Sequence, residues 1–356
     1  MTVCQAGAEK ILKEEFLREQ PELRFSYSRP GFVTFKNADE KRLFAPDFAL
    51  KSVFARAFAL SVGKAAGAPE LLEKVVKLRA DAGLGERKLR LHVFERDRHV
   101  PGEEPPGFEP RALAEQARQS VEGEAARSGL ELFEEEAVAR EGDPVLSVVI
   151  VEESEWWLGY HVHGPGHSPY PGGDPQVGLP KDAPSRAYLK LEEAAIASGA
   201  PLAGGDIAVE IGSSPGGASF ALLKRGLQVV GIDPAEMDPR VAAHQNFSHL
   251  RAPVAAVRRE DLPARIDWLL LDMNVAPSVT LHQVERLAGR MKDTLKGVIL
   301  TFKLNEPEFA AEIPEWIERV RGLGMSRVKA VQLRSNKREI CIVGLTRLAS
   351  AIRSAR

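Results

Sequence analysis

The stretch Ile207–Gly217 constrains the fold of this chain more than any other part of the sequence. Its apolar first half leads directly into the turn Gly-Ser-Ser-Pro-Gly-Gly, and Ala218–Gly226 then has the apolar spacing of a helix closed by glycine. A second strand pattern, Leu227–Asp233, ends in an acid. A strand, a glycine turn and a helix that open an α/β unit place backbone N–H groups where a cofactor can bind. The pattern therefore predicts a Rossmann-like sheet with a cofactor at this turn.

The glycine spacing narrows the choice of cofactor. A dinucleotide fingerprint is G-x-G-x-x-G, whereas here Gly212 is followed by Gly216 and Gly217, with Pro215 before them and Glu210 in the strand. A carboxylate at this point would repel a pyrophosphate but would suit a ligand that carries an amino group or a sulfonium. S-adenosylmethionine has both and is the predicted cofactor. A nicotinamide cofactor and a plain turn without a ligand are the alternatives.

Composition excludes several classes of protein. With 356 residues, 44% hydrophobic and 28% charged, the chain has the composition of a globular protein large enough for more than one domain. No apolar run approaches the roughly 20 residues of a membrane span, and the N-terminus lacks a signal-peptide pattern. Two cysteines, Cys4 and Cys341, are consistent with a reducing compartment. These features predict a cytoplasmic protein without a membrane partner.

Charge is distributed unevenly along the chain, although the net charge is only −2. Residues 319–356 contain ten Lys or Arg and one acid, whereas residues 101–143 contain twelve acids and four Arg. The basic C-terminal segment could contact phosphates. Ordinary solvated side chains explain the charge equally well, so charge alone does not identify a nucleic-acid partner.

The first half of the chain alternates between helix and strand patterns. We predict helices at Gly7–Glu19 and Arg111–Ser128, and strands at the following segments: Gly31–Lys36, Leu89–Phe94, Leu146–Val151 and Glu155–Tyr160. This alternation indicates small α+β units, which we divide into residues 1–50 and 51–164. Residues 165–182 are rich in Pro and Gly and are predicted to be a linker.

Residues 183–356 are predicted to form a larger α/β domain. Its expected strands are Ile207–Ile211, Leu227–Ile232, Ala252–Arg258, Ile266–Leu271 and Val298–Phe302, followed by a hairpin of Ser326–Leu333 and Arg338–Leu345. This is a mostly parallel, doubly wound sheet with an antiparallel hairpin at its edge. Ligands of such sheets bind at the carboxyl ends of the strands.

Charged residues follow most of these strands. The strand ends and the hairpin carry the following residues: Glu210, Asp233, Asp261, Asp272, Lys303 and Glu339. Upstream of the first strand a helix is predicted to begin with Ser185 as the N-cap and Lys190 in its second turn. A lysine that is desolvated near a second ammonium has a lowered pKa and can take a proton from an alcohol. Acids beside it have the opposite effect, and two ordinary salt bridges are the alternative interpretation.

The histidines His161, His163 and His167 are the only motif that suggests a metal site. They lie in a Gly/Pro turn, and neither a cysteine nor a spaced pair of acids completes a tetrahedral set. We therefore predict no metal site.

Taken together, the glycine turn, Ser185–Glu193, Asp272, Lys303 and Glu339 resemble the pattern of FtsJ-type RNA ribose 2′-O-methyltransferases. Ser168–Gly172 and Asp182–Arg186 resemble the bacterial RlmM branch of that family more closely. This resemblance implies methylation of a cytidine in large-subunit (23S) ribosomal RNA. The partner would be the ribosomal RNA or a pre-ribosomal particle. It also implies a ferredoxin-like piece in residues 1–50 and a THUMP-type RNA-binding module in residues 51–164.

The sequence departs from the branch at Ala218, where an aromatic residue is common, and in the loop Met273–Pro277.

The resemblance implies a role for each matching residue. Lys303 would deprotonate the ribose 2′-hydroxyl, Lys190 and Asp272 would align the reacting groups, and Glu339 would fix Lys190 or the ribose. The residues expected to contact the cofactor are Ser185, Glu210, Gly212, Ser214, Pro215, Gly216, Gly217, Asp233, Asp261 and Asp272. Two alternatives are a 2′-O-methyltransferase of another RNA, such as a transfer RNA, and a non-catalytic RNA-binding or assembly factor with the same fold. The second lysine argues against the non-catalytic factor, because a binding module does not need it.

Overall fold

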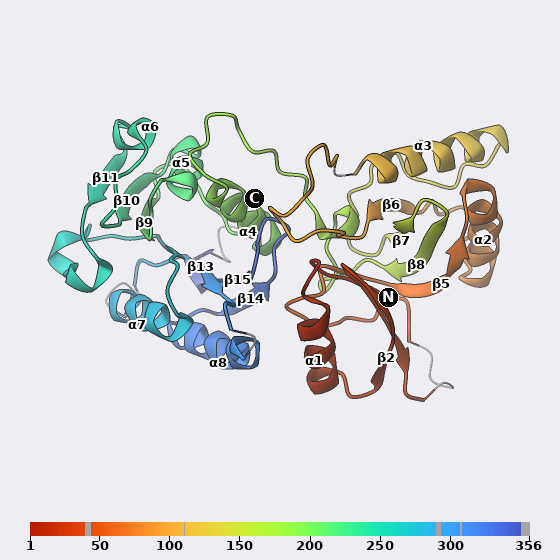
Figure 1. The fold of residues 1–356 in the computed structure, drawn as a ribbon, viewed down its shortest axis with the longest axis horizontal. Helices are drawn as coiled ribbons and strands as arrows, with labels where there is room; N and C mark the ends of the chain where they lie inside the picture. The colour runs from red at the N-terminus through yellow and green to blue at the C-terminus, as the bar shows by residue number, and fades with distance from the viewer. Residues whose placement is uncertain (40–43, 110, 290–292, 307, 350–356) are drawn as a thin grey trace. The chain divides into compact units, whose positions relative to one another are not determined.

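A computed structural model describes the chain over residues 1–39, 44–109, 111–289, 293–306 and 308–349 (Figure 1). The chain divides into two compact units, Met1–Pro175 and Gln176–Arg356. Among the described residues, no helix is both long and apolar enough to cross a membrane.

The first unit contains two four-stranded sheets. The first sheet has the strand order β2-β3-β1-β4 and one helix, with these elements: β1 (Thr2–Val3), α1 (Glu9–Glu19), β2 (Leu23–Arg29), β3 (Phe32–Asn37) and β4 (Ala57–Phe58). Phe16 of α1 stacks on Phe35 of β3, with ring centroids 4.3 Å apart, and so fastens the helix to the sheet.

The second sheet of this unit has the order β5-β8-β7-β6 and carries two helices (Figure 1). Its elements are β5 (Leu60–Ala65), α2 (Ala68–Asp81), β6 (Arg90–Glu95), α3 (Ala112–Arg127), β7 (Pro144–Glu152) and β8 (Glu155–Val162). Leu71 of α2, Val121 of α3 and Leu146 of β7 are buried in one apolar core between the helices and the sheet. The Gly/Pro-rich segment that follows forms a short 3-10 turn, η1 (Pro171–Gly173), against β6. The helices expected at Gly7–Glu19 and Arg111–Ser128 are confirmed as α1 and α3.

The second unit is built on one seven-stranded sheet with the order β11-β10-β9-β12-β13-β15-β14. Its strands are β9 (Ile207–Ile211), β10 (Gln228–Ile232), β11 (Phe247–Leu250), β12 (Trp268–Asp272), β13 (Gly297–Lys303), β14 (Arg327–Val331) and β15 (Glu339–Leu345). β15 pairs antiparallel with both β13 and β14, and the other neighbouring pairs are parallel. The mostly parallel sheet and its antiparallel edge hairpin are therefore confirmed.

Helices cover both faces of this sheet (Figure 1). They are α4 (Ala187–Ser198), α5 (Gly217–Lys224), α6 (Pro239–Ala242), α7 (Pro277–Ala288) and α8 (Phe309–Gly322). Leu191 of α4 and Leu222 of α5 share a core with Trp268 and Ile299 of the strands. α4 and α5 lie on one side of the sheet, and α7 and α8 lie on the other.

The strand expected at Ala252–Arg258 is wrong. The third parallel strand is β11, which lies earlier in the sequence and pairs with β10. Pro253 lacks the N–H that a ladder needs, and the chain turns into a 3-10 segment at Val254–Ala256. Val254 and Val257 are nevertheless buried, which explains why the segment has the apolar pattern of a strand.

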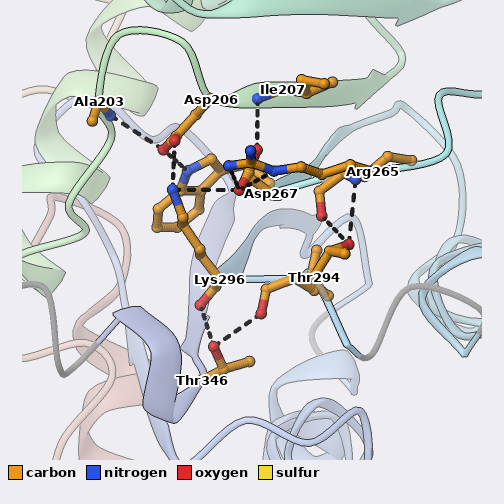
Figure 2. Close-up of polar contacts among 11 residues, drawn as sticks. Ala203, Asp206, Ile207, Arg265, Asp267, Thr294, Lys296 and Thr346 are labelled. Atoms are coloured by element: carbon orange, nitrogen blue, oxygen red, sulfur yellow. Dashed lines mark hydrogen bonds and ion pairs between the residues drawn. The ribbon is translucent and has the colours of Figure 1, made fainter.

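A buried polar network joins the amino ends of β9, β12 and β13 (Figure 2). Lys296 Nζ lies 2.5 Å from Asp206 Oδ1 and 3.3 Å from Asp267 Oδ1. The other carboxylate oxygens accept hydrogen bonds from Trp268 Nε1 at 2.8 Å and from the Ile207 backbone at 2.9 Å. Burial raises the pKa of Asp267, but hydrogen bonds and the adjacent cations outweigh burial and hold it below its ordinary value. The network fixes the relative position of three strands whose opposite ends carry the candidate site.

Candidate functional site: an acid–base ring beside a cofactor turn

Four charged side chains meet at the carboxyl edge of the sheet in the second unit. Asp272 is the last residue of β12, Lys303 the last of β13, Glu339 the first of β15, and Lys190 lies in α4. Because β15 is antiparallel to β13, Glu339 is paired directly with Lys303 in the ladder. The topology thus brings residues from widely separated parts of the sequence to one point.

These four side chains alternate in charge and form a closed ring. Lys190 Nζ lies 3.0 Å from Asp272 Oδ2 and 2.8 Å from Glu339 Oε1. Lys303 Nζ lies 2.5 Å from Glu339 Oε2 and 3.8 Å from Asp272 Oδ1. Each lysine therefore contacts both acids, which differs from the two separate salt bridges considered as an alternative.

Burial distinguishes the members of this acid–base ring. The Glu339 side chain is 3% exposed, whereas that of Lys303 is 21% exposed. Burial alone would raise the pKa of Glu339, but the two lysines outweigh it and lower this pKa. Burial likewise acts to lower the pKa of Lys190, but Asp272 and Glu339 outweigh it and raise this pKa. Lys190 is thus held as a cation and is unsuited to accept a proton, and Lys303 is the candidate base that the resemblance implies.

The glycine turn between β9 and α5 lies next to the ring because its glycines permit close packing. Gly212 has φ +78°, and a Cβ there would come within 2.4 Å of the Asp272 carbonyl oxygen. A Cβ on Gly217 would lie 2.2 Å from Ser185 Oγ. The turn is therefore pressed against the end of β12 on one side and against the start of α4 on the other.

Glu210 is the buried acid of this region. It is 2% exposed, and one of its carboxylate oxygens accepts a hydrogen bond from Ser219 Oγ at 2.5 Å. Burial raises its pKa from 4.5 to about 8. A buried carboxyl with such a pKa favours a ligand that brings a positive charge, which fits the amino group of S-adenosylmethionine.

A cavity connects Glu210 with the acid–base ring. Its lining comes from α4, β9, α5, β12 and β13 and consists of Ala187, Lys190, Leu191, Glu210, Ala218, Leu270, Leu271, Asp272, Ile299 and Thr301. Two expected catalytic residues, Lys190 and Asp272, thus line the same cavity as Glu210. Ala218, where an aromatic residue was expected from the resemblance to the RlmM branch, contributes a small side chain to this lining.

Asp233 and Ser214 are joined at the far side of the turn. The Ser214 backbone N–H donates to Asp233 Oδ2 at 3.1 Å, and Ser214 Oγ donates to the Glu236 carbonyl at 2.8 Å. Pro215 follows Ser214 through a cis peptide bond. Asp233 therefore fixes the turn through one oxygen, and it follows β10, where a ribose hydroxyl pair would lie in such folds.

Asp261 does not follow a strand and Ser185 is not a helix N-cap, so both occupy local positions other than those expected from sequence. Asp261 is an exposed residue of a 3-10 turn, pairs with Arg258 at 3.2 Å and does not line the cavity. Ser185 is not the N-cap: α4 begins at Ala187, Arg186 precedes it without a side-chain cap, and Lys190 falls in the first turn. Ser185 Oγ instead accepts a hydrogen bond from the Ala187 N–H at 3.3 Å, which holds it against Gly217.

Sequence reasoning missed Ser219 and Glu193. Ser219 was not singled out, although a serine two residues after Gly217 is well placed to face the preceding strand. Glu193 lies one turn after Lys190 in α4, is 5% exposed and accepts hydrogen bonds from Ser335. The spacing of three residues between Lys190 and Glu193 was the available signal, because it places both on one helix face.

The histidines of the first unit lie together but far in sequence from this site. The rings of His161 and His167 stack with centroids 4.2 Å apart, and burial lowers the pKa of His161 to about 2 and that of His167 to about 4. In the part of the chain that the structure describes, no group of three or more His, Cys, Asp or Glu could hold a metal ion.

Comparison with known families finds a match within the second unit. Residues 183–340 match the family model of the FtsJ-like methyltransferases. Over this segment, which is less than half of the chain, the protein is similar to the FtsJ-like methyltransferases, and its mostly parallel sheet is Rossmann-like.

Curated proteins that are similar to this chain share one name. Ribosomal RNA large subunit methyltransferase M of Tolumonas auensis is 29% identical over 212 residues, covering 56% of this chain and 56% of that protein. The proteins of the same name from Alkalilimnicola ehrlichii and Azoarcus sp. are 35% identical over 157 residues and 30% identical over 213 residues. These two alignments cover 42% and 57% of this chain, and 41% and 57% of the respective relatives. The chain spans about half the length of the curated relatives it matches.

Proposed function

We propose that this protein transfers a methyl group from S-adenosylmethionine to the 2′-hydroxyl of a ribose in RNA, and that the RNA is large-subunit (23S) ribosomal RNA with a cytidine as the target. The observation that carries the proposal is the acid–base ring beside the cavity of Glu210. The name of the curated relatives, ribosomal RNA large subunit methyltransferase M, supports the choice of RNA. The substrate is the ribosomal RNA itself or a pre-ribosomal particle.

The ring supplies the proton chemistry of this reaction. When bound, S-adenosylmethionine supplies a methyl group on a positively charged sulfur, which departs as a neutral thioether. Lys303 Nζ, in its neutral form, accepts the proton of the 2′-hydroxyl while the ribose oxygen forms its bond to the methyl carbon. Lys190 stays charged because Asp272 and Glu339 surround it.

The other residues align the reaction. Asp272 contacts both lysines from the end of β12, and Glu339 contacts both from the start of β15. A ring held from four elements fixes the base relative to the cavity, and such positioning provides a large part of the acceleration of a transfer reaction. Glu210 would hold the amino group of the cofactor, and Asp233 would hold its ribose.

The first unit would bind the RNA. We assign residues 1–50 as a ferredoxin-like piece, residues 51–164 as a THUMP-type RNA-binding module, and residues 165–182 as a linker to the methyltransferase domain at residues 183–356. The support is the pair of four-stranded sheets with their helices, together with the resemblance of the second half of the chain to the RlmM branch. Both cysteines are buried and unpaired, which supports a cytoplasmic location.

Ribose-methylation mapping of total RNA from cells with and without this chain tests the proposal. We expect one methylated cytidine of 23S ribosomal RNA to lose its methyl group when the chain is absent and to regain it with the parent chain, but not with Lys303→Ala. Loss of a methyl group in transfer RNA alone would contradict the choice of RNA. An unchanged map, together with no transfer by the purified protein to naked or particle-bound ribosomal RNA, would contradict the reaction.

A further inference from the structure

The segment between β14 and β15 combines buried anchors with exposed cations. We call Arg334–Arg338 the basic turn. Its middle residues, Ser335 and Asn336, are 5% and 0% exposed, whereas Lys337 and Arg338 are exposed. The buried residues hold the backbone of the turn in place, and Lys337 and Arg338 expose two positive charges to solvent.

Hydrogen bonds to α4 and within the turn hold this backbone. Glu193 Oε2 accepts hydrogen bonds from the Ser335 backbone at 2.9 Å and from Ser335 Oγ at 3.0 Å. Asn336 Oδ1 accepts one from the Leu333 backbone at 2.8 Å. All of these groups are buried, so the bonds are shielded from water. Since Lys190 lies one helical turn before Glu193, the helix that supplies a lysine of the ring also anchors the basic turn.

The basic turn continues directly into the acid–base ring. The Arg338 carbonyl accepts a hydrogen bond from the Leu304 N–H at 2.8 Å, and Leu304 is the residue after Lys303. The Lys337 N–H donates to Glu339 Oε1 at 3.4 Å. The two exposed cations are therefore joined through the backbone to the residues that would meet the reacting ribose.

Lys337 and Arg338 have no anionic partner among the residues that the structure describes. Over the described residues, no carboxylate forms an ion pair with Lys337 or Arg338, whereas most cations around them in sequence have partners, such as Arg319 with Glu285. Two unpaired cations on a rigid turn fit a polyanion, and the phosphates adjoining a ribose are the anions nearest to a 2′-hydroxyl.

We propose that Lys337 and Arg338 bind the RNA phosphates that flank the target ribose and so set which ribose reaches Lys303. This inference rests on the proposed function and adds to it the element that fixes the register of the RNA. Phosphate contacts position a nucleic acid without reading its sequence. The basic turn therefore acts on the affinity for RNA and leaves the chemistry of the ring unchanged.

The double variant Lys337→Gln/Arg338→Gln of the 356-residue chain tests this inference, with S-adenosylmethionine present for the kinetics and absent for the salt-dependent binding of RNA. The probe is a transcript of 23S ribosomal RNA. We expect the KM for RNA to rise about tenfold and the slope of log affinity against log salt to become shallower by about two, because two phosphate contacts are lost. The kcat and the affinity for S-adenosylmethionine stay within about twofold of the parent, since neither residue belongs to the ring.

The matched control removes two cations at the opposite edge of the same sheet. Arg347 follows the far end of β15, and Arg321 lies in the last turn of α8; both are exposed. Arg321→Gln/Arg347→Gln is expected to leave the KM and the salt slope unchanged. Equal changes in both double variants, or an unchanged salt slope in the variant of the basic turn, would overturn the inference. Salt-dependent binding is measured without turnover, so it decides this point even if the parent fails to methylate RNA, which would contradict the proposed function instead.

Discussion

Lys303 and Glu339 face each other across the antiparallel pair of β13 and β15, with Lys303 Nζ 2.5 Å from Glu339 Oε2. The pair lies at the edge of the sheet where the parallel strands end. An antiparallel strand such as β15 begins at that edge. Because Glu339 opens its strand, the basic turn that precedes it reaches the same edge. One reversal of strand direction thus brings together the candidate base, its acid partner and the cations proposed to hold RNA.

Replacing Lys303 by Met is expected to lower kcat for methyl transfer by about 100-fold or more, because general-base catalysis is lost while the apolar stem is retained. Binding of S-adenosylmethionine, measured by calorimetry, should stay close to that of the parent. Lys329→Met provides the control, because Lys329 lies on the edge strand β14, away from the ring, and donates to the Ala197 carbonyl of α4. A parental rate in Lys303→Met would show that another group accepts the proton.

Replacing Glu210 by Gln is expected to abolish a proton release that accompanies cofactor binding. At pH 7 the Glu210 carboxyl, with a pKa raised to about 8 by burial, is largely protonated. A bound ammonium group would favour the carboxylate, so binding releases a proton. Calorimetry in buffers of different ionisation enthalpy measures this proton. Equal proton release by the parent and Glu210→Gln would mean that Glu210 does not meet the charged group.

The stability of the apo protein should also depend on Glu210. Its folded pKa lies above the unfolded value of 4.5, so the unfolded state binds fewer protons between pH 4.5 and about 8. The Glu210 contribution to the free energy of unfolding therefore decreases as pH rises through this window. Gln cannot ionise, so Glu210→Gln should gain stability relative to the parent from pH 5 to pH 8, as measured by denaturant unfolding. A constant difference across this range would contradict the raised pKa.

Replacing Glu339 by Gln should lower the stability of the domain. The Glu339 contribution should increase with rising pH, whereas that of Glu210 decreases. The pKa of Glu339 is lowered because the two lysines outweigh burial, so its charge stabilises the fold above pH 4.5 and this contribution is lost as pH falls through the lowered value. The variant should melt below the parent at pH 7, and the gap should narrow below pH 4.5. A difference in melting temperature that grows as pH falls would contradict a stabilising role of the acid–base ring.

Replacing Asp206 by Asn should lower the free energy of unfolding by about 3 kcal/mol, because it leaves the part-buried Lys296 with one anion fewer. Chemical denaturation provides the measurement. Arg265→Gln is the matched control, since Arg265 also contacts Asp267 but has a 57% exposed side chain and should matter little. Equal losses in the two variants would show that burial of the network (Figure 2) does not determine its contribution.

Replacing Gly217 by Ala should displace the start of α4, because the added Cβ would meet Ser185 Oγ at 2.2 Å and the Ser185 carbonyl oxygen at 2.9 Å. We expect a loss of about 1–3 kcal/mol in stability and weaker cofactor binding. Gly178→Ala is the control, because a Cβ there meets nothing within 4 Å. Parental cofactor affinity in Gly217→Ala would show that the close contact is not needed.

Sequence reasoning succeeded where residue type and position both carry information. Glu210, Asp272 and Lys303 follow apolar strands, and the parallel topology brings such strand ends together. It failed at Ala252–Arg258, where the buried valines give the apolar pattern of a strand but Pro253 is followed by a 3-10 segment. It also missed the strand β2, although Pro30 and Gly31 mark the turn of a hairpin with β3. The closure of the ring by Glu339 on both lysines depends on side-chain distances that no sequence pattern encodes.

The position of β15 inside the sheet determines when the site can form as the domain folds during synthesis. β15 is the last strand described, yet it lies between β13 and β14, both of which leave the ribosome earlier. Until β15 inserts, Asp272 is the one acid of the ring available to Lys190 and Lys303, because Glu339 is the first residue of β15. The reaction centre is therefore assembled only after β15 has been synthesised, and a nascent chain that stops before β15 has the cofactor turn but not the closed acid–base ring.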